Sequence, residues 1–393
     1  MKWHVSRRPF VYHLGLPPAQ SFQESGYLSL NTNPIEYPSN TLQLKGESTC
    51  PHDNARKADL NWLPVPLDHP ELKWNGRAAK TDGVVSIDWS LSGLEFNLEG
   101  AAARIELSAG DTSDINCTYV AVSVNGRRTA KFRLRAGRNW YILAEDLDPC
   151  SVAHIRLEKL NEAVFAYADV TALEIAGELK TAPRRRAKTI EVVGDSISAG
   201  FGVLAGPSED FTAMTEDGAY TYGALLADKL DAELFLVAAS GYGIYMNNDG
   251  STKENMADLY ELAQPSRSKT MRWNQQAVHP DLIIVNLGTN DNAAGAPKSK
   301  VSEKVKAFIG RLSDLHPHAV FLWVYGLMNT DYMDTLHQAV EDMAAAGHRA
   351  RFLKLPNQSS LSSSTGAAGH PNQETHMKTA AYLLPYAVEL LEG

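Results

Sequence analysis

The chain has 393 residues, of which 44% are hydrophobic and 21% are charged, and its formal net charge is −9. This length accommodates two domains with hydrophobic cores of their own, and the composition is that of an ordinary soluble protein. The negative charge argues against nucleic acids and anionic membranes as partners.

The cysteines and the first residues of the chain indicate in which cellular compartment the protein is expected. The three cysteines, Cys50, Cys117 and Cys150, are widely spaced, which argues against a disulfide framework or a zinc site but permits one bridge. The opening sequence MKWHVSRRPF lacks the apolar run of a signal peptide, and no later window has the length of a membrane span. We therefore expect a cytoplasmic protein, unless an export signal has been removed from the chain.

The first half of the chain predicts two regions. Prolines break up residues 1–70, so we expect an irregular extension there, packed on the region that follows. Over residues 71–178, short runs alternate apolar and polar residues, and Asn125-Gly126 is a strong hairpin signal. This pattern predicts a jelly-roll-like β-sandwich domain, which could bind carbohydrate or brace its neighbour. The expected strands are 84–89, 94–98, 103–107, 119–124, 130–134, 140–143, 154–157 and 164–175.

Residues 179–188 are expected to be a linker, after which strand-like and helix-like patterns alternate. This alternation predicts a doubly wound α/β domain over residues 189–393, with a flavodoxin-like, parallel five-stranded sheet. A final helix is expected from about Gln373 to Leu391, interrupted by Pro385. The expected strands are Ile190–Val193, Leu234–Ala238, Leu282–Leu287, Val320–Tyr325 and Phe352–Leu355.

Three loops that follow predicted strands carry groups suited to ester hydrolysis. Ser196 follows the first strand in a tight turn, and in an open parallel sheet such loops share one edge. Gly241 follows the second strand and lets a backbone N–H approach a ligand, while the Asn290 amide after the third strand can donate to an oxyanion. Each has a structural alternative: the Ser196 turn could cap a helix or hold a phosphate, Gly241 could serve the turn alone, and Asn290 could form an Asx turn.

His370 is the histidine whose position suits a general base. It lies after the fifth predicted strand and just before the last helix, so its loop should reach the same edge as Ser196. A histidine there could take the serine proton and return it to a leaving group. His376 lies inside the last helix and is expected to be structural. Because no His, Cys or Asp cluster has ligand spacing, we expect no metal or cofactor.

The C-terminal half contains four short motifs in the order in which the GDSL/SGNH hydrolases have them. They are Gly194-Asp195-Ser196, Gly241, Gly288-x-Asn290-Asp291 and His370-Pro371. The sequence therefore resembles this family. The resemblance implies that Ser196 is the nucleophile and His370 its base. It also implies an oxyanion hole formed by the N–H groups of Ser196 and Gly241 and the amide of Asn290.

One position departs from the pattern of that family. Its members usually have an aspartate two or three residues before the histidine, where this chain has Ala367 and Ala368. Such an aspartate holds the imidazole in the correct tautomer and orientation. A carboxylate from elsewhere, or a backbone carbonyl, must take that role for His370.

A second resemblance is carried by His154–Lys159 with Glu162, Phe165–Ile175, Gly241–Ile244, Asn247-Asn248, Met256–Tyr260 and Trp273. Together with the order of the two predicted domains, these segments resemble carbohydrate esterase family 2, whose members remove acetyl groups from sugar hydroxyls. By this resemblance Trp273 would be an aromatic platform for a sugar ring, although it could instead pack in the core. Asp195 and Tyr242 would also contact substrate.

The sequence thus predicts a serine esterase that deacetylates xylan- or mannan-type sugars through an acetyl-enzyme intermediate. Its partner would be an acetylated oligo- or polysaccharide, and the sequence makes no prediction of the oligomeric state. A lipid or acyl-thioester hydrolase on the same scaffold is one alternative. A non-catalytic carbohydrate-binding protein is the other.

Overall fold

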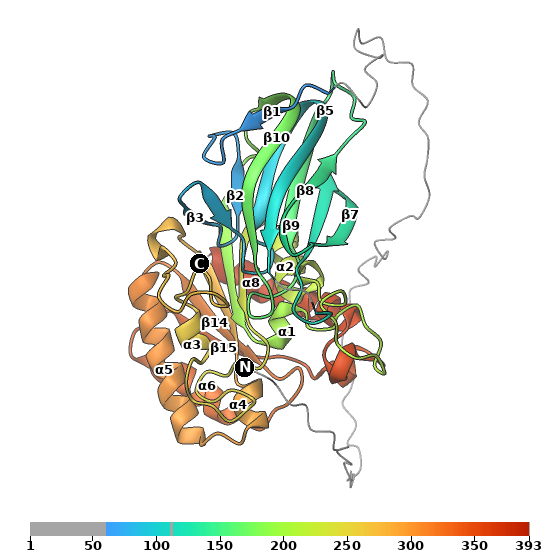
Figure 1. Cartoon of the computed structure of the whole chain (residues 1–393). Coiled ribbons are helices and arrows are strands. Elements are labelled where there is room, and N and C mark those ends of the chain that lie inside the picture. The colour runs from blue at the N-terminus through green and yellow to red at the C-terminus, as the bar shows by residue number, and fades with distance from the viewer. Residues whose placement is uncertain (1–59, 111–112, 393) are drawn as a thin grey trace, which may run out of the picture. The chain divides into compact units, whose positions relative to one another are not determined.

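The computed structural model describes residues 60–110 and 113–392. Most of the predicted N-terminal extension, residues 1–70, therefore lies outside the described residues. The described part contains an antiparallel β-rich region followed by a parallel α/β region (Figure 1).

Among the described residues, ten strands pair into an antiparallel sheet built around two long strands, β5 (Gly93–Ala109) and β10 (Ala168–Lys180). The strand order is β3-β4-β10-β5-β9-β6-β7, with β1 on β10 and with β2 and β8 on β5. The other eight strands are β1 (Leu63–Val65), β2 (Lys73–Asn75), β3 (Ala79–Thr81), β4 (Val84–Ser86), β6 (Tyr119–Val124), β7 (Arg127–Arg133), β8 (Gly137–Ala144) and β9 (Val152–Lys159).

The long strand β5 corrects one sequence prediction. Strands were expected at 94–98 and 103–107, with a break between them, but the chain continues as one strand through Gly100. The register against β10 shifts beside Gly177, and a Cβ on Gly100 would lie 2.4 Å from the Ala176 carbonyl oxygen. Gly100 therefore allows a close backbone approach at a bulge, where the sequence pattern indicated a turn.

The predicted hairpin at Asn125-Gly126 is confirmed. These two residues join β6 to β7, and both have positive φ angles, +50° and +76°. This geometry is the two-residue turn that Asn-Gly favours, because its twist matches that of the flanking strands.

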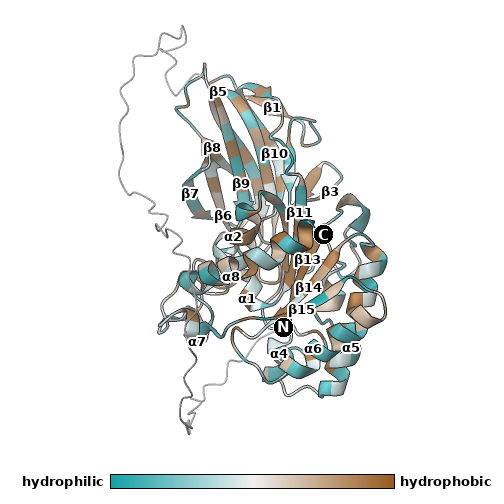
Figure 2. Ribbon diagram, turned by 180° about the vertical axis from the view of Figure 1, so that it is seen from behind, coloured by the Kyte–Doolittle hydropathy of each residue, from teal (hydrophilic) through white to brown (hydrophobic). Residues whose placement is uncertain are grey.

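The α/β region contains the predicted parallel five-stranded sheet. Its strand order is β12-β11-β13-β14-β15, which is 2-1-3-4-5 in chain order, as in flavodoxin-like sheets. Figure 2 shows the apolar colouring of its central strands. Apolar runs of this kind are expected where helices cover both faces of a sheet. The strands are β11 (Lys188–Gly194), β12 (Ala232–Ala238), β13 (Leu282–Asn286), β14 (Val320–Tyr325) and β15 (Ala350–Lys354).

Two pairs of helices cover the two faces of this sheet. Buried side chains of α5 and α6, such as Phe308 and Leu336, pack in the core that contains Val193 and Val285. Helices α2 and α8 pack on the other face, where Leu226 is buried with Val192 in a second core. None of the helices in the described residues has an apolar stretch long enough to cross a membrane.

The predicted interruption of the last helix at Pro385 is wrong, since α8 continues through it. Proline removes one backbone N–H donor, a loss that the packing of α8 on the sheet offsets here. The helices are α1 (Ser196–Ala199), α2 (Tyr222–Lys229), α3 (Met256–Leu259), α4 (Thr289–Ala293), α5 (Lys298–Leu315), α6 (Met333–Ala345), α7 (Gln358–Leu361) and α8 (Gln373–Glu392). Short 3-10 turns are η1 (Gly218–Tyr220), η2 (Gln275–Ala277) and η3 (Ala367–Gly369).

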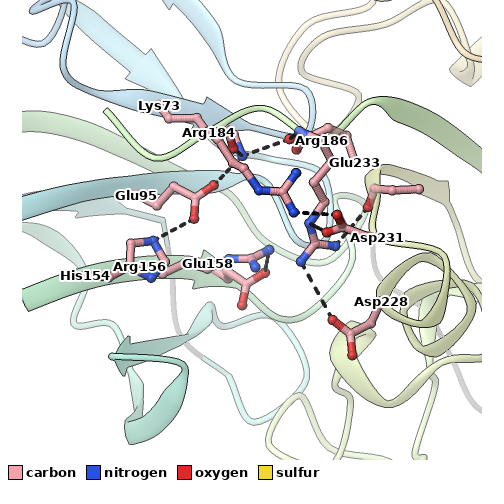
Figure 3. A network of polar contacts seen from close by, with 11 residues as sticks. Lys73, Glu95, His154, Arg156, Glu158, Arg184, Arg186, Asp228, Asp231 and Glu233 are labelled. Atoms are coloured by element: carbon pink, nitrogen blue, oxygen red, sulfur yellow. Dashed lines mark hydrogen bonds and ion pairs between the residues drawn. The ribbon is translucent and has the colours of Figure 1, made fainter. Parts of the chain in front are cut away.

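Ion pairs join the antiparallel strands to the beginning of the parallel sheet (Figure 3). Lys73 of β2 lies 2.7 Å from Glu95 of β5 and 2.8 Å from Glu233 of β12. Arg184, in the segment between β10 and β11, pairs with Asp231 just before β12. These contacts lie where the parallel strands begin, at the edge opposite the carboxyl ends.

Candidate active site

Ser196 lies at the sharp turn from β11 into α1. Gly194 is the last residue of the strand, and a Cβ there would lie 2.1 Å from Ser198 Oγ, so only glycine fits this close approach. Asp195 caps the helix, because its carboxylate accepts a hydrogen bond of 3.1 Å from the Ile197 N–H. Ser196 is therefore the first residue of a helix at the carboxyl edge of the sheet, and it is 7% exposed.

The structure brings His370 to Ser196. His370 follows η3 and precedes α8, and its Nε2 lies 2.9 Å from Ser196 Oγ. This is hydrogen-bonding distance for a nucleophile and its base. The two residues are 174 positions apart in the chain, and the parallel strand topology brings their loops together.

A backbone carbonyl faces the other nitrogen of His370. Its Nδ1 lies 3.2 Å from the carbonyl oxygen of Ala367, a contact that favours the tautomer protonated on Nδ1. Nε2 is then left to accept the Ser196 proton. The sequence left open whether a carboxylate or a backbone carbonyl holds the His370 ring. In the structure it is the backbone carbonyl of Ala367.

The small residues before His370 permit this arrangement. Ala368 adopts a left-handed φ of +50°, which turns the chain between Ala367 and the histidine. Ala367 donates its N–H to the Gly202 carbonyl, and a Cβ on Gly202 would lie 2.3 Å from the Ala367 side chain. The close packing of these two segments leaves little room for a larger side chain at position 367.

Aromatic rings surround His370. Phe201 lies with its ring centroid 4.6 Å from the imidazole, and Phe211 stacks on Phe201 at 3.8 Å. Burial in this setting lowers the pKa of His370 below its ordinary value. The uncharged form, which a general base requires, is therefore favoured to a lower pH than in water.

We expect ester hydrolysis to persist below the ordinary histidine pKa. A base with a lowered pKa loses activity only as the pH falls through that lowered value, so the acid limb of kcat/KM should have its midpoint below about pH 6.5. A profile with p-nitrophenyl acetate measures this. The Phe201→Ala variant lets water reach the ring and should move the midpoint upward, and a wild-type midpoint above the ordinary value would contradict the account.

Ser196 and Gly241 follow neighbouring parallel strands, β11 and β12, at the carboxyl edge of the sheet. Gly241 follows β12 with φ +85°, and a Cβ there would lie 3.1 Å from the Asn248 side chain. The Asn248 N–H in turn donates to the Gly241 carbonyl at 2.8 Å. Within the described residues, no acceptor is recorded for the N–H of Gly241 or of Ser196. Both groups can therefore donate to a substrate oxygen.

Asn290 lies in the loop after β13, at the beginning of α4. Its amide nitrogen is 3.0 Å from the Tyr242 carbonyl oxygen and 3.4 Å from a carboxylate oxygen of Asp195. The second contact is long and therefore weak. The amide hydrogen that makes this weak contact could be shared with a substrate oxygen while the other keeps its bond to Tyr242.

Asp291 has a role that the sequence did not reveal. Its fully buried carboxylate accepts hydrogen bonds of 2.8 Å from the N–H groups of Ile244, Tyr245 and Met246. It thereby holds the loop that follows Gly241. In the sequence, only its position next to Asn290 pointed to Asp291. Its three hydrogen-bond donors are backbone N–H groups, which any residue type could supply.

Asp195 and Tyr242 both have contacts with Asn290. The Asp195 carboxylate is fully buried and faces Ile197 and Asn290, so its contact with substrate stays a prediction. Burial raises the pKa of Asp195 to about 7. Tyr242 supplies its carbonyl oxygen to Asn290, and its half-buried ring packs against the core.

Trp273 lies against a buried arginine. The Trp273 ring lies 5.9 Å from the guanidinium of Arg77, and Arg77 pairs with Glu191 at 2.9 Å. Glu191 lies three residues, roughly 10 Å, before the end of β11. This contact places the Trp273 ring toward the beginning of the parallel strands, and its role as a platform for a sugar ring stays a prediction.

No group of three or more His, Cys, Asp or Glu side chains that could hold a metal ion occurs among residues 60–110 and 113–392.

Residues 192–378 match the GDSL-like Lipase/Acylhydrolase family. The chain is 28% identical to the cellulase/esterase CelE of Acetivibrio thermocellus, over 80% of this chain and 39% of that protein. It is 25% identical to an acetylxylan esterase / glucomannan deacetylase of Cellvibrio japonicus, over 84% of this chain and 91% of that protein. The chain thus spans only about two fifths of the first relative.

Solved structures share the fold over most of this chain. A family two carbohydrate esterase from Clostridium thermocellum, in complex with cellohexaose, is 26% identical with a TM-score of 0.76, covering 82% of this chain and 99% of that one. An acetyl xylan esterase from the rumen bacterium Butyrivibrio proteoclasticus is 22% identical with a TM-score of 0.78, covering 85% and 100%. Residues 192–378 therefore form a GDSL-like lipase/acylhydrolase domain, in a chain similar over about four fifths of its length to carbohydrate esterases of family 2.

Proposed function

We propose that this protein is a serine esterase that removes O-acetyl groups from acetylated sugars. The observation that carries the proposal is the distance of 2.9 Å between Ser196 Oγ and His370 Nε2. Curated relatives named as acetylxylan esterase / glucomannan deacetylase support an acetyl ester as substrate. The relative solved with cellohexaose supports a carbohydrate as partner.

The first half of the reaction forms an acetyl-enzyme. Ser196 Oγ attacks the carbonyl carbon of the acetyl ester while His370 Nε2 takes the hydroxyl proton. The carbonyl oxygen becomes an oxyanion and receives hydrogen bonds from the N–H groups of Ser196 and Gly241 and from the Asn290 amide. When the tetrahedral intermediate collapses, the bond to the sugar oxygen breaks, and His370 gives its proton to that oxygen.

The second half regenerates the serine. Water attacks the acetyl-enzyme carbonyl and gives a proton to His370. A second oxyanion forms at the same donors, and its collapse breaks the bond to Ser196 Oγ. His370 returns the proton to the serine, and acetate leaves.

The Ala367 carbonyl has a defined part in both halves. When His370 takes the serine proton it becomes an imidazolium, and the carbonyl oxygen 3.2 Å from Nδ1 accepts a hydrogen bond from that cation. A carbonyl carries no full charge, so it stabilises the imidazolium less than an aspartate would. We therefore propose a Ser–His dyad rather than a triad.

We further propose that the antiparallel strands form a jelly-roll sandwich. In support, β5 pairs with β9 along its first half and with β8 along its second, with the bulge near Gly100 between them. A long strand that exchanges partners at a bend is how two sheets share a strand.

The acyl-chain preference tests the proposal against a lipid or acyl-thioester hydrolase. Initial rates with p-nitrophenyl acetate, butyrate and octanoate should give the highest kcat/KM with acetate, because a deacetylase needs room for a methyl group only. The matched substrates share one leaving group, so the series reports the acyl pocket alone. A preference for octanoate would contradict deacetylation and favour the lipid hydrolase.

A further inference from the structure

A loop of the antiparallel region reaches the candidate active site from outside the α/β domain. The loop, residues 160–167, joins β9 to β10 and carries Glu162, whose side chain is fully buried. One Glu162 carboxylate oxygen accepts a hydrogen bond of 2.6 Å from the Ser240 N–H. The other accepts a hydrogen bond from the Ser240 hydroxyl. Ser240 directly precedes Gly241.

We propose that Glu162 is a positioning residue, which aims the Gly241 N–H at the oxyanion by fixing Ser240. This inference rests on the proposed esterase function. Glu162 itself touches none of the reacting atoms. Its effect would pass through the Ser240–Gly241 peptide unit to the Gly241 N–H, which donates a hydrogen bond to the oxyanion.

The geometry of the peptide bond explains how the effect passes. The N–H of Gly241 and the carbonyl of Ser240 belong to one planar unit, so the direction of that N–H follows the backbone angles of Ser240. Glu162 holds Ser240 at both its N–H and its hydroxyl, which restrains the backbone and the side chain together. Preorganised donors of this kind lower the barrier because they need not reorient during the reaction.

Glu162 is itself held by buried charged groups. Its own N–H donates to a Glu216 carboxylate oxygen at 3.0 Å, and the Lys159 ammonium donates to its carbonyl at 3.1 Å. All three side chains are fully buried. Burial raises the pKa of Glu162 to about 7, while its hydrogen bonds from Ser240 lower it. A buried carboxylate is costly to keep, which points to a function for it beyond packing.

A second contact of the same loop reaches the base. Phe165 lies with its ring centroid 5.5 Å from Phe211, and Phe211 stacks on Phe201 at 3.8 Å. Phe201 in turn faces His370. The loop at residues 160–167 thus contacts the surroundings of both the oxyanion donors and the base, from a region that contributes no reacting group in the proposed mechanism.

Steady-state kinetics of the full chain test the inference. With p-nitrophenyl acetate, Glu162→Ala should lower kcat by about 10- to 100-fold and leave KM within about twofold, because an oxyanion donor acts mainly in the transition state. Glu162→Gln should recover most of this loss, since its amide can accept from the Ser240 N–H and donate to the hydroxyl oxygen. Ser240→Ala removes one bond and should give a smaller loss than Glu162→Ala.

Arg128→Met is the matched control. Arg128 of β7 pairs with Asp217 at 2.7 Å, so it too joins the antiparallel region to the α/β domain, but it has no contact with Ser240. This variant should lower the Tm and leave kcat unchanged. The inference is overturned if Glu162→Ala has the kcat of the wild type, or if Arg128→Met loses kcat to the same degree.

Three further outcomes are distinguishable. If Glu162→Ala does not fold, Ser240→Ala and Glu162→Gln decide. A kcat of Ser240→Ala equal to that of the wild type then overturns the inference, and so does a kcat of Glu162→Gln below that of Ser240→Ala. If the wild type hydrolyses no faster than Ser196→Ala, the proposed function fails and this inference with it. Wild-type activity with unaffected Glu162 variants overturns the inference alone.

Discussion

Replacing Ser196 by alanine should lower kcat for p-nitrophenyl acetate by about 10⁴-fold or more, because the variant has no oxygen to form the acetyl-enzyme. Ser198→Ala is the matched control. Its hydroxyl lies in the same short helix but bonds to the Tyr222 hydroxyl at 2.8 Å, away from His370. The control should keep kcat within about tenfold of the wild type, since it removes one buried hydrogen bond and no reacting group.

Equal hydrolysis by the wild type and Ser196→Ala would contradict the nucleophile assignment. It would favour a non-catalytic carbohydrate-binding protein, in which the Ser196–His370 hydrogen bond has only a structural role. Binding of an acetylated oligosaccharide without turnover, measured by calorimetry on both proteins, would then identify that function.

His370→Ala should lower kcat by about 10⁴-fold or more as well, since the serine hydroxyl is a weak nucleophile without a base. Added imidazole should restore part of the activity, because it can occupy the space left by the ring and accept the proton. The rate of acetyl ester hydrolysis against imidazole concentration measures this.

His376 provides the control for that experiment. It is buried in α8, and its Nδ1 accepts a hydrogen bond of 3.1 Å from the Tyr222 N–H. Burial lowers the pKa of His376 to about 3, so it stays uncharged over the working range. His376→Gln should change the Tm and leave the acid limb of the pH profile in place. An acid limb that moves with His376 and survives in His370→Ala would contradict the assignment of the base.

Local pattern was enough to predict the parallel sheet and the meeting of Ser196 with His370. Buried parallel strands are continuous apolar runs, so the strands β11 to β15 could be predicted from the sequence. The shared edge of a doubly wound sheet then follows from topology alone, and it places Ser196, Gly241, Asn290 and His370 in neighbouring loops.

Contacts between distant segments were not predictable in the same way. Glu162 and Ser240 are 78 positions apart, and a buried carboxylate that binds a backbone N–H has no periodicity. The Ala367 carbonyl is a backbone group, which every residue has. The resemblance predicted that Trp273 contacts a sugar. Its contact with Arg77 could not be predicted, because it depends on how the β-rich strands pack on the α/β domain.

The most direct test of the deacetylase account is proton NMR of a defined acetylated xylo- or manno-oligosaccharide incubated with the protein. The account predicts that the wild type releases free acetate. The proton signal at one acetylated ring carbon should then move to the chemical shift of the free alcohol, while Ser196→Ala leaves the spectrum unchanged. No acetate release from any acetylated position by a folded wild-type protein would contradict it.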